Sequence, residues 1–306
     1  MKKIESLKKI GQVILIFSLI LFLFSPVLNL NVEAHSHQMD IVETAQDAGS
    51  FTTLLAAAEE AGLVDALKGE GPLTVFAPND DAFNQLLEET GLTAEELLAD
   101  PRLGNILKFH VVPGKVMSTD LADGMSAETL LSPQEINISI NDGVFLNDDI
   151  QVIAPDIEAS NGVIHVIDGV LWPADIVETA VAGGFNTLVT AVDRAGLVEA
   201  LKGPGLFTVF APIDEAFEAL PSGVLEELLD NPEDLADVLL FHVISGQVMA
   251  ETVLNFDGQE VETLLGETIE ISVDHGEAFL GQSKVTRTDI QTLNGVIHVI
   301  DLVLVP

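Results

Sequence analysis

Two five-residue stretches, Thr74-Val75-Phe76-Ala77-Pro78 and Thr208-Val209-Phe210-Ala211-Pro212, are identical and lie 134 positions apart. Each is typical of a short β-strand that a proline ends. Three further segments recur in the same order along the chain: Asp40–Ala45 with Asp175–Ala180, Phe109–Val111 with Phe241–Val243, and Asn161–Asp168 with Asn294–Asp301. A repeat of this length is too long for a solenoid unit and indicates a duplicated globular domain.

Each copy places its helical patterns before most of its strand patterns. Apolar residues at 51, 54, 55 and 58 follow helical spacing, whereas those at 136, 138 and 140 alternate with polar residues before an Asp142-Gly143 turn. Thr93 and Glu96 have the form of a capping box, and Asn79 or Asp80 can cap the helix after Pro78. Helices grouped before a mostly antiparallel set of strands predict an α+β fold. We predict one domain at 38–172 and a second at 173–306.

The repeated motifs together resemble the fasciclin (FAS1) domain. The resemblance rests on the Thr-Val-Phe-Ala-Pro segment, the later Phe-His pair and the terminal Asn-Gly-Val-Ile-His-Val-Ile-Asp strand, which follow the order of the family's motifs. It covers about residues 38–306. It implies that each copy is a compact β-sandwich flanked by N-terminal helices. It also implies a role in extracellular adhesion, or in association with a matrix or biofilm.

The resemblance further implies two candidate binding positions. In animal matrix members of the family, an Asp-Ile pair just before the second motif has been assigned to integrin binding. The matching pairs in this chain are Asp156 with Ile157 and Asp289 with Ile290. The alternative is that each pair only closes a strand and exposes an ordinary surface charge.

Eight motif residues are expected to be structural: Phe76, Pro78, His110, His165, Phe210, Pro212, His242 and His298. In strand register, His165 faces the same side as Val163 and Ile167, which predicts a buried and hydrogen-bonded histidine. A ligand-binding or catalytic histidine is the alternative. Asp80 and its counterpart Asp214 follow the Ala-Pro turn, where helix capping explains them.

The N-terminus has the pattern of a secretion signal. Residues 1–12 carry four lysines, an apolar run follows from 13 to 24, and Val32 and Ala34 stand at positions −3 and −1 of a cleavage site. We therefore predict a signal peptide at 1–34 and a secreted or cell-surface protein, and the lysine-rich leader is typical of bacteria. An uncleaved anchor that reaches Leu30 is the alternative, although the run is short for a span of about 20 residues.

Cleavage after Ala34 would leave His35 and His37 at positions one and three of the mature chain. A free amine with a histidine at position three can hold Cu²⁺ or Ni²⁺ in square-planar nitrogen coordination. These two histidines are therefore a candidate metal site, and a disordered N-terminus is the alternative.

Composition limits the remaining functions. The chain has 49 acidic residues, 12 basic ones and no cysteine, for a formal net charge of −37. This charge repels phosphate backbones and anionic lipids, so we expect neither nucleic acid nor, after signal cleavage, a membrane as partner. It fits either ordinary dispersal in solution or life in salt. The lack of cysteine excludes thiol catalysis and disulfides.

No catalytic motif stands out in the sequence, and no cofactor is expected. We predict a non-enzymatic adhesion or matrix protein that binds an extracellular protein, a polysaccharide or its own copies. One alternative is an extracellular carrier of a small apolar ligand, although a single tryptophan and no tyrosine offer little to line a pocket. A hydrolase is a third possibility that the motif search disfavours.

Overall fold

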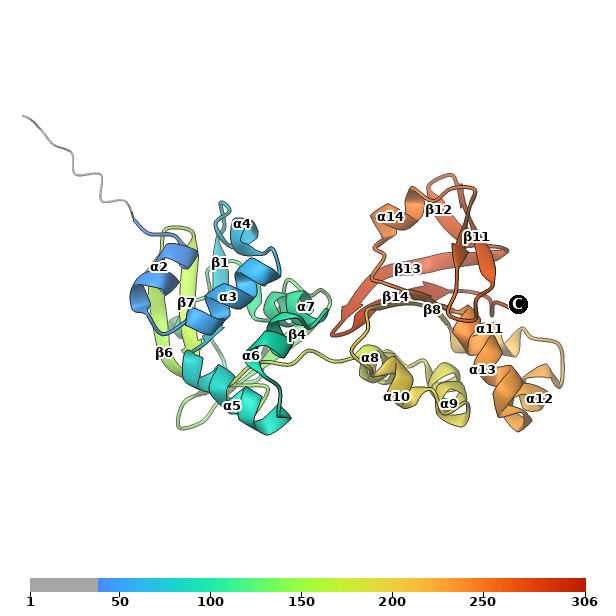
Figure 1. The fold of residues 1–306 in the computed structure, drawn as a ribbon, viewed down its shortest axis with the longest axis horizontal. Coiled ribbons are helices and arrows are strands. Elements are labelled where there is room, and N and C mark those ends of the chain that lie inside the picture. The colour runs from blue at the N-terminus through green and yellow to red at the C-terminus, as the bar shows by residue number, and fades with distance from the viewer. Residues whose placement is uncertain (1–37) are drawn as a thin grey trace, which may run out of the picture. The chain divides into compact units, whose positions relative to one another are not determined.

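The computed structural model describes residues 38–306, in which two repeats each combine helices with one seven-stranded sheet (Figure 1). The predicted signal at 1–34 and the pair His35 and His37 lie outside the described residues. No helix among the described residues is long and apolar enough to cross a membrane.

The first repeat opens with helices and continues into the sheet. Its helices are α2 (Ile41–Ala48), α3 (Thr52–Glu60), α4 (Val64–Leu67), α5 (Asp80–Thr90), α6 (Ala94–Leu98), α7 (Leu103–Phe109) and the 3-10 turn η1 (Ser118–Asp120). Its strands are β1 (Leu73–Pro78), β2 (Val111–Pro113), β3 (Met125–Glu128), β4 (Glu135–Ile140), β5 (Val144–Leu146), β6 (Ile150–Ala159) and β7 (Gly162–Ile167).

The second repeat follows the same order. Its helices are α8 (Ile176–Ala182), α9 (Asn186–Arg194), α10 (Val198–Leu201), α11 (Asp214–Glu218), α12 (Val224–Asp230), α13 (Pro232–Phe241) and α14 (Ala250–Leu254). Its strands are β8 (Phe207–Pro212), β9 (Val243–Ser245), β10 (Gln259–Glu262), β11 (Thr268–Asp274), β12 (Glu277–Leu280), β13 (Ser283–Thr292) and β14 (Gly295–Ile300).

The first and last strands of each repeat lie side by side within its sheet, next to an edge strand. The strand order in the first repeat is β2-β1-β7-β6-β5-β4-β3, and only β1 and β7 pair in parallel. Gly162 opens β7, and a Cβ atom there would lie 2.0 Å from the backbone oxygen of Leu73. The glycine of the Asn-Gly-Val-Ile-His motif is therefore required by the close approach of these two backbones.

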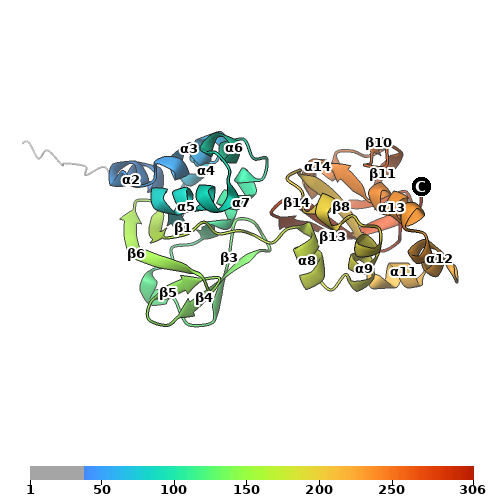
Figure 2. The ribbon, with the colours of Figure 1, turned by 60° about the horizontal axis from the view of Figure 1, so that its bottom comes forward.

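Two apolar layers lie on opposite faces of β1 and β7. Phe76 points into a core shared with β4, β5 and the loop residue Leu131, whereas Val75 and Ala77 pack against α2 and Phe51. Figure 2 shows β3, β4 and β5 on the side of β1 away from the helices. Because both faces are covered, every residue of β7 is buried. The predicted α+β sandwich with flanking helices is confirmed.

Local sequence signals explain how several helices begin. Asp40 caps α2 and Thr93 caps α6, each in a capping box with the residue three positions later. The side chain of Asn79 caps α5 by accepting from the amide of Ala82. The capping predictions for Thr93 and Asn79 are confirmed.

Candidate functional site

The Asp-Ile pair of the first repeat lies at a bulge inside a strand. The register between β6 and β7 shifts between Ala154 and Ile157, and Asp156 has a positive φ of 62°. Because β6 continues to Ala159, the pair does not close the strand. The bulge turns the Asp156 side chain out of the regular pleat, which is how bulges re-aim side chains.

Two hydrogen bonds hold the Asp156 carboxylate in place. The amide of Ser118 donates to Oδ1 at 2.8 Å, and the Ser118 hydroxyl donates to Oδ2. These hydrogen bonds keep the pKa of Asp156 below its usual value, with a smaller contribution from the charge of Lys115. The carboxylate thus fastens β6 to the first residue of η1.

The second repeat holds its aspartate less firmly. Asp289 has φ 60° at the equivalent bulge, and its Oδ1 accepts from the amide of Ala250 at 2.8 Å. Ala250 stands where the first repeat has Ser118, so the hydroxyl hydrogen bond has no counterpart. A carboxylate that accepts fewer hydrogen bonds from its own chain has more acceptor capacity for a partner.

The isoleucines of the two pairs differ in exposure. Ile157 is half-buried, whereas Ile290 is only 5% exposed and belongs to the core beneath the helices of its repeat. An Asp-Ile contact with a partner would therefore use the aspartate, because the core already holds Ile290.

His165 and His298 each form a hydrogen bond with the backbone of one of these bulges. The amide of Asp156 donates to Nδ1 of His165 at 3.2 Å, and Nε2 lies 2.8 Å from the backbone oxygen of Val116. Because an amide only donates and a carbonyl only accepts, Nε2 carries the proton and the ring is neutral. His298 makes the same contacts with Asp289 and Val248, and burial lowers its pKa.

His110 and His242 are fully enclosed. Nδ1 of His110 donates to the Ile106 carbonyl at 2.8 Å, and Nε2 accepts from the amide of Leu171 at 2.9 Å. His242 repeats this arrangement with Val238 and Leu304. Burial lowers the pKa of each histidine to about 4. With both ring nitrogens engaged, neither histidine has a free lone pair for a metal or a substrate proton.

Asn161 has a bridging role that the sequence analysis did not assign. Its Oδ1 accepts from the amide of Ile41, and its Nδ2 donates to the carbonyls of Leu67 and Gly69. Asn294 repeats the three contacts in the second repeat. The signal was present in the sequence, because the asparagine recurs unchanged, but its partners lie up to 120 residues away.

The predicted role of Asp80 needs correction. The carboxylate of Asp80 accepts from the amides of Thr52 and Thr53, so it caps α3 rather than the helix that follows Pro78. Burial tends to raise its pKa, but these amide hydrogen bonds prevail and lower it. Asp214 likewise accepts from the amide of Thr187, the second residue of α9.

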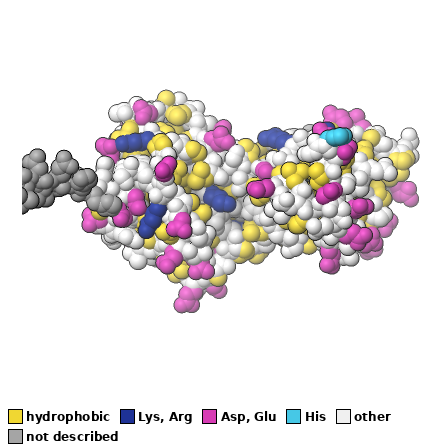
Figure 3. All heavy atoms as spheres, turned by 90° about the horizontal axis from the view of Figure 1, so that it is seen from above, with side chains coloured by type: hydrophobic (Ala, Val, Ile, Leu, Met, Phe, Trp, Pro, Cys, Tyr) yellow, Lys and Arg dark blue, Asp and Glu magenta, His cyan; other side chains and the backbone are white. Residues whose placement is uncertain are grey.

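Acidic side chains dominate the charge on the surface. In Figure 3 they are spread over both repeats, with Lys and Arg side chains sparse between them. Within residues 38–306, no three His, Asp or Glu side chains lie close enough to form a metal site. The charge is therefore a property of the whole surface in view and marks no single cation site there.

The chain matches the model of a known protein family. The model of the fasciclin domain matches residues 49–173 and again residues 183–306, which together are most of the chain. The protein belongs to the fasciclin-domain family, as its repeated motifs predicted.

Similar proteins come from animals and bacteria. Transforming growth factor-beta-induced protein ig-h3 of Sus scrofa is 32% identical over 276 residues, which are 87% of this chain and 39% of that protein. Protein sll1483 of Synechocystis sp. is 44% identical over 134 residues, 43% of this chain and 73% of that protein. A solved domain pair from the insect cell adhesion molecule fasciclin I aligns with TM-score 0.45 and 18% identity over 85% of this chain and 98% of that one. The chain spans about two fifths of the length of ig-h3.

Proposed function

We propose that this chain is an exported adhesion or matrix-associated protein without enzymatic activity. The observation that carries the proposal is that two fasciclin domains occupy most of the described chain, at 49–173 and 183–306. We assign the domains to 38–172 and 173–306 and the signal to 1–34, with a secreted or cell-surface location. Relatives of this family support an adhesion or matrix-associated role at that coarse level.

The state of the histidines supports a binding role over catalysis. General base catalysis needs a side chain within hydrogen-bond reach of a substrate proton. Both nitrogens of His110 and His165 are already committed to partners in the chain, and the same holds for His242 and His298. We infer that these side chains hold segments of the fold together.

The binding surface that we favour is the bulge of the second repeat. Asp289 is partly exposed, and among the described residues its carboxylate accepts one hydrogen bond, from the amide of Ala250. The partner class is an extracellular protein or polysaccharide, or a second copy of the chain. Because the surface is strongly acidic, a basic protein partner would bind more weakly as salt increases, whereas a neutral polysaccharide would not.

A direct test uses the exported chain on glycan arrays and in cross-linking on its native cell surface. Asp289→Asn should reduce the captured partner without loss of folding, whereas the matched Asp156→Asn should change stability more than binding. Failure of the unmodified protein to capture any protein, glycan or second copy would contradict the adhesion role. Equal capture by Asp289→Asn and the unmodified protein would place the binding surface elsewhere.

A further inference from the structure

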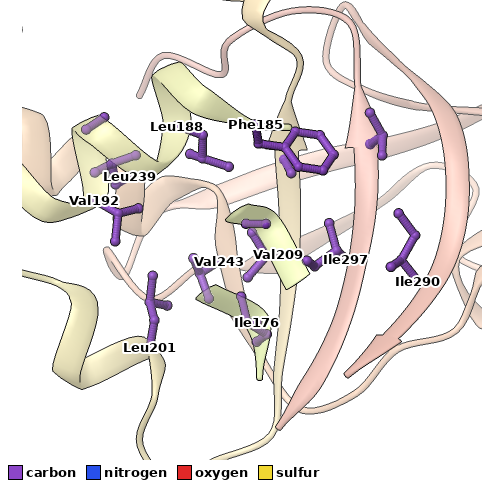
Figure 4. Packing of buried hydrophobic residues seen from close by; sticks show 14 of the residues in the cluster. Ile176, Phe185, Leu188, Val192, Leu201, Val209, Leu239, Val243, Ile290 and Ile297 are labelled. Carbon is purple, nitrogen blue, oxygen red and sulfur yellow. The ribbon is translucent and has the colours of Figure 1, made fainter. Parts of the chain in front are cut away.

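The second repeat contains an apolar cavity between its helices and its sheet. The cavity has a volume of about 100 Å³ and lies among α8, α9, α10 and α13 on one side and β8, β9 and β14 on the other. Figure 4 shows Val192 and Leu201 from the helices directed toward Val243 and Val209 of the strands. The space is thus lined by both layers of the repeat.

The cavity is lined almost entirely by apolar side chains. Seventeen of the eighteen lining residues have apolar side chains, and His242 is the exception. Nδ1 of His242 donates to Val238, and Nε2 accepts from the amide of Leu304. Since the only polar side chain is satisfied, water gains no partner inside and an apolar occupant loses none.

Part of the cavity lining reaches the surface. Leu264 lines it and is 38% exposed, the lining residue Ala200 is exposed, and Leu240 is half-buried. An exposed leucine at this position extends the apolar lining outward. A molecule longer than the cavity can therefore enter with one end and leave the rest outside.

The size limits the occupant to a thin apolar group. An engineered apolar cavity of roughly 150 Å³ stays dry and binds benzene or xenon, so a smaller cavity suits a narrower hydrocarbon. We propose that the cavity of the second repeat binds the end of a linear alkyl chain, with the remainder of the molecule leaving past Ala200 and Leu264. The net charge of −37 disfavours an anionic head group, so the ligand is a neutral or cationic alkyl compound.

The first repeat provides an internal contrast. Its equivalent cavity has a volume of about 50 Å³, and Lys108 takes the place of Leu240 in the lining. A charged amine keeps its head in water and leaves only its stem for apolar contact. We therefore expect one strong binding site for an alkyl chain per protein chain, in the second repeat.

Titration of the full chain with 1-octanol, followed by methyl NMR, tests the proposal. The methyl signals of Val192, Leu201 and Val243 should shift in a saturable way with one site per chain. Ala200→Leu crowds the mouth and should weaken binding roughly tenfold or more, as one added methylene can in an apolar pocket. The matched Ala66→Leu, at the equivalent exposed position of the first repeat, should leave the affinity unchanged.

A second pair of variants separates binding from folding. Leu240→Lys places the residue of the first repeat at the mouth and should weaken 1-octanol binding with the thermal unfolding temperature retained. Octanoate should bind more weakly than 1-octanol. Shifts that never saturate, or affinity equal in Ala200→Leu and the unmodified chain, would overturn the proposal.

Discussion

The two repeats share a backbone bulge but differ in how they anchor the aspartate at its centre. Asp156 accepts from both the amide and the hydroxyl of Ser118, whereas Asp289 accepts from the amide of Ala250. The bulge and the amide donated to the histidine are the same in both. The shared contacts therefore belong to the fold, and the hydroxyl contact is an addition that one repeat can lack.

Other polar contacts also separate into those that recur in both repeats and those that occur in only one. His110 accepts from the amide of Leu171, 61 positions later, and the hydroxyl of Thr74 donates to the carbonyl of Gly114, 40 positions later. Both contacts recur in the second repeat. A local cap varies instead, since Ile213 stands where Asn79 caps α5 and makes no side-chain cap. Long-range bridges cannot be replaced by a neighbouring residue, whereas a helix can begin without its cap at a cost of about 1 kcal/mol.

Truncation of the central phenylalanine should have the largest effect on each repeat. Phe76 and Phe210 are each 1% exposed. Phe76→Ala and Phe210→Ala should each cost about 3–5 kcal/mol, because a large cavity remains. Urea unfolding checks this with Trp172, the only tryptophan, as a probe of the first repeat and far-UV circular dichroism for both. An equal shift of the Trp172 transition by both variants would show that the repeats unfold as one unit.

Acidification should weaken both repeats, because each contains a fully buried histidine with a lowered pKa. The pKa of His110 and of His242 falls from 6.5 to about 4 in the folded chain, so the unfolded chain binds more protons between these values. The contribution of each histidine to the free energy of unfolding is fully present above pH 6.5. It is lost as pH drops toward 4, by on the order of 3 kcal/mol per histidine. Urea unfolding at pH 7 and pH 4.5 measures the loss.

Asp80 and Asp156 contribute little to the loss measured between these two pH values. The folded pKa values of Asp80 and Asp156 are lowered from 3.8, so their contributions are lost only as pH falls further. Stability that stayed constant from pH 7 to pH 4.5 would contradict the buried, neutral state of the two histidines.

Removal of the bridging asparagine should have an intermediate effect. Asn161→Ala leaves the amide of Ile41 and two carbonyls without their partner, at a cost of about 2–3 kcal/mol. Asn294→Ala should cost the same in the second repeat. Hydrogen exchange at Ile41 and Ile176 checks the local opening, and unchanged protection of these amides would count against the bridge.

The smallest effect should distinguish the two bulges. Asp156→Asn should cost about 1 kcal/mol and Asp289→Asn less, because Asp156 accepts the additional hydroxyl hydrogen bond. Ser118→Ala should bring the first repeat to the level of the second, and Ala250→Ser should do the reverse. Chemical unfolding of the four variants measures these differences. Equal costs at the two aspartates would show that the Ser118 hydroxyl adds nothing.

Local patterns in the sequence were sufficient for the elements and the duplication. The capping box of Thr93 and Glu96 acts within one turn, and the alternation through Ile136 and Ile138 follows the strand pleat. The register rule also placed His165 on the face of Ile167, since it stacks on Phe76 in the same layer. Short-range rules suffice wherever the interacting groups are close in the chain.

The tertiary structure decided the contacts that join distant segments. The sequence suggested that Asp80 caps the following helix, but the fold brings the amides of α3 to it from 28 residues away. The bulge at Asp156, the satisfied nitrogens of His110 and the cavity beside Leu264 also depend on packing between layers. The sequence by itself determined the duplication and many local elements, because propensity and periodicity act locally, and the repeated motifs carried the resemblance to the fasciclin domain. Only the assembled fold determined which polar groups remain available and where hydrocarbon lines an open space, because both depend on what three-dimensional packing leaves uncovered.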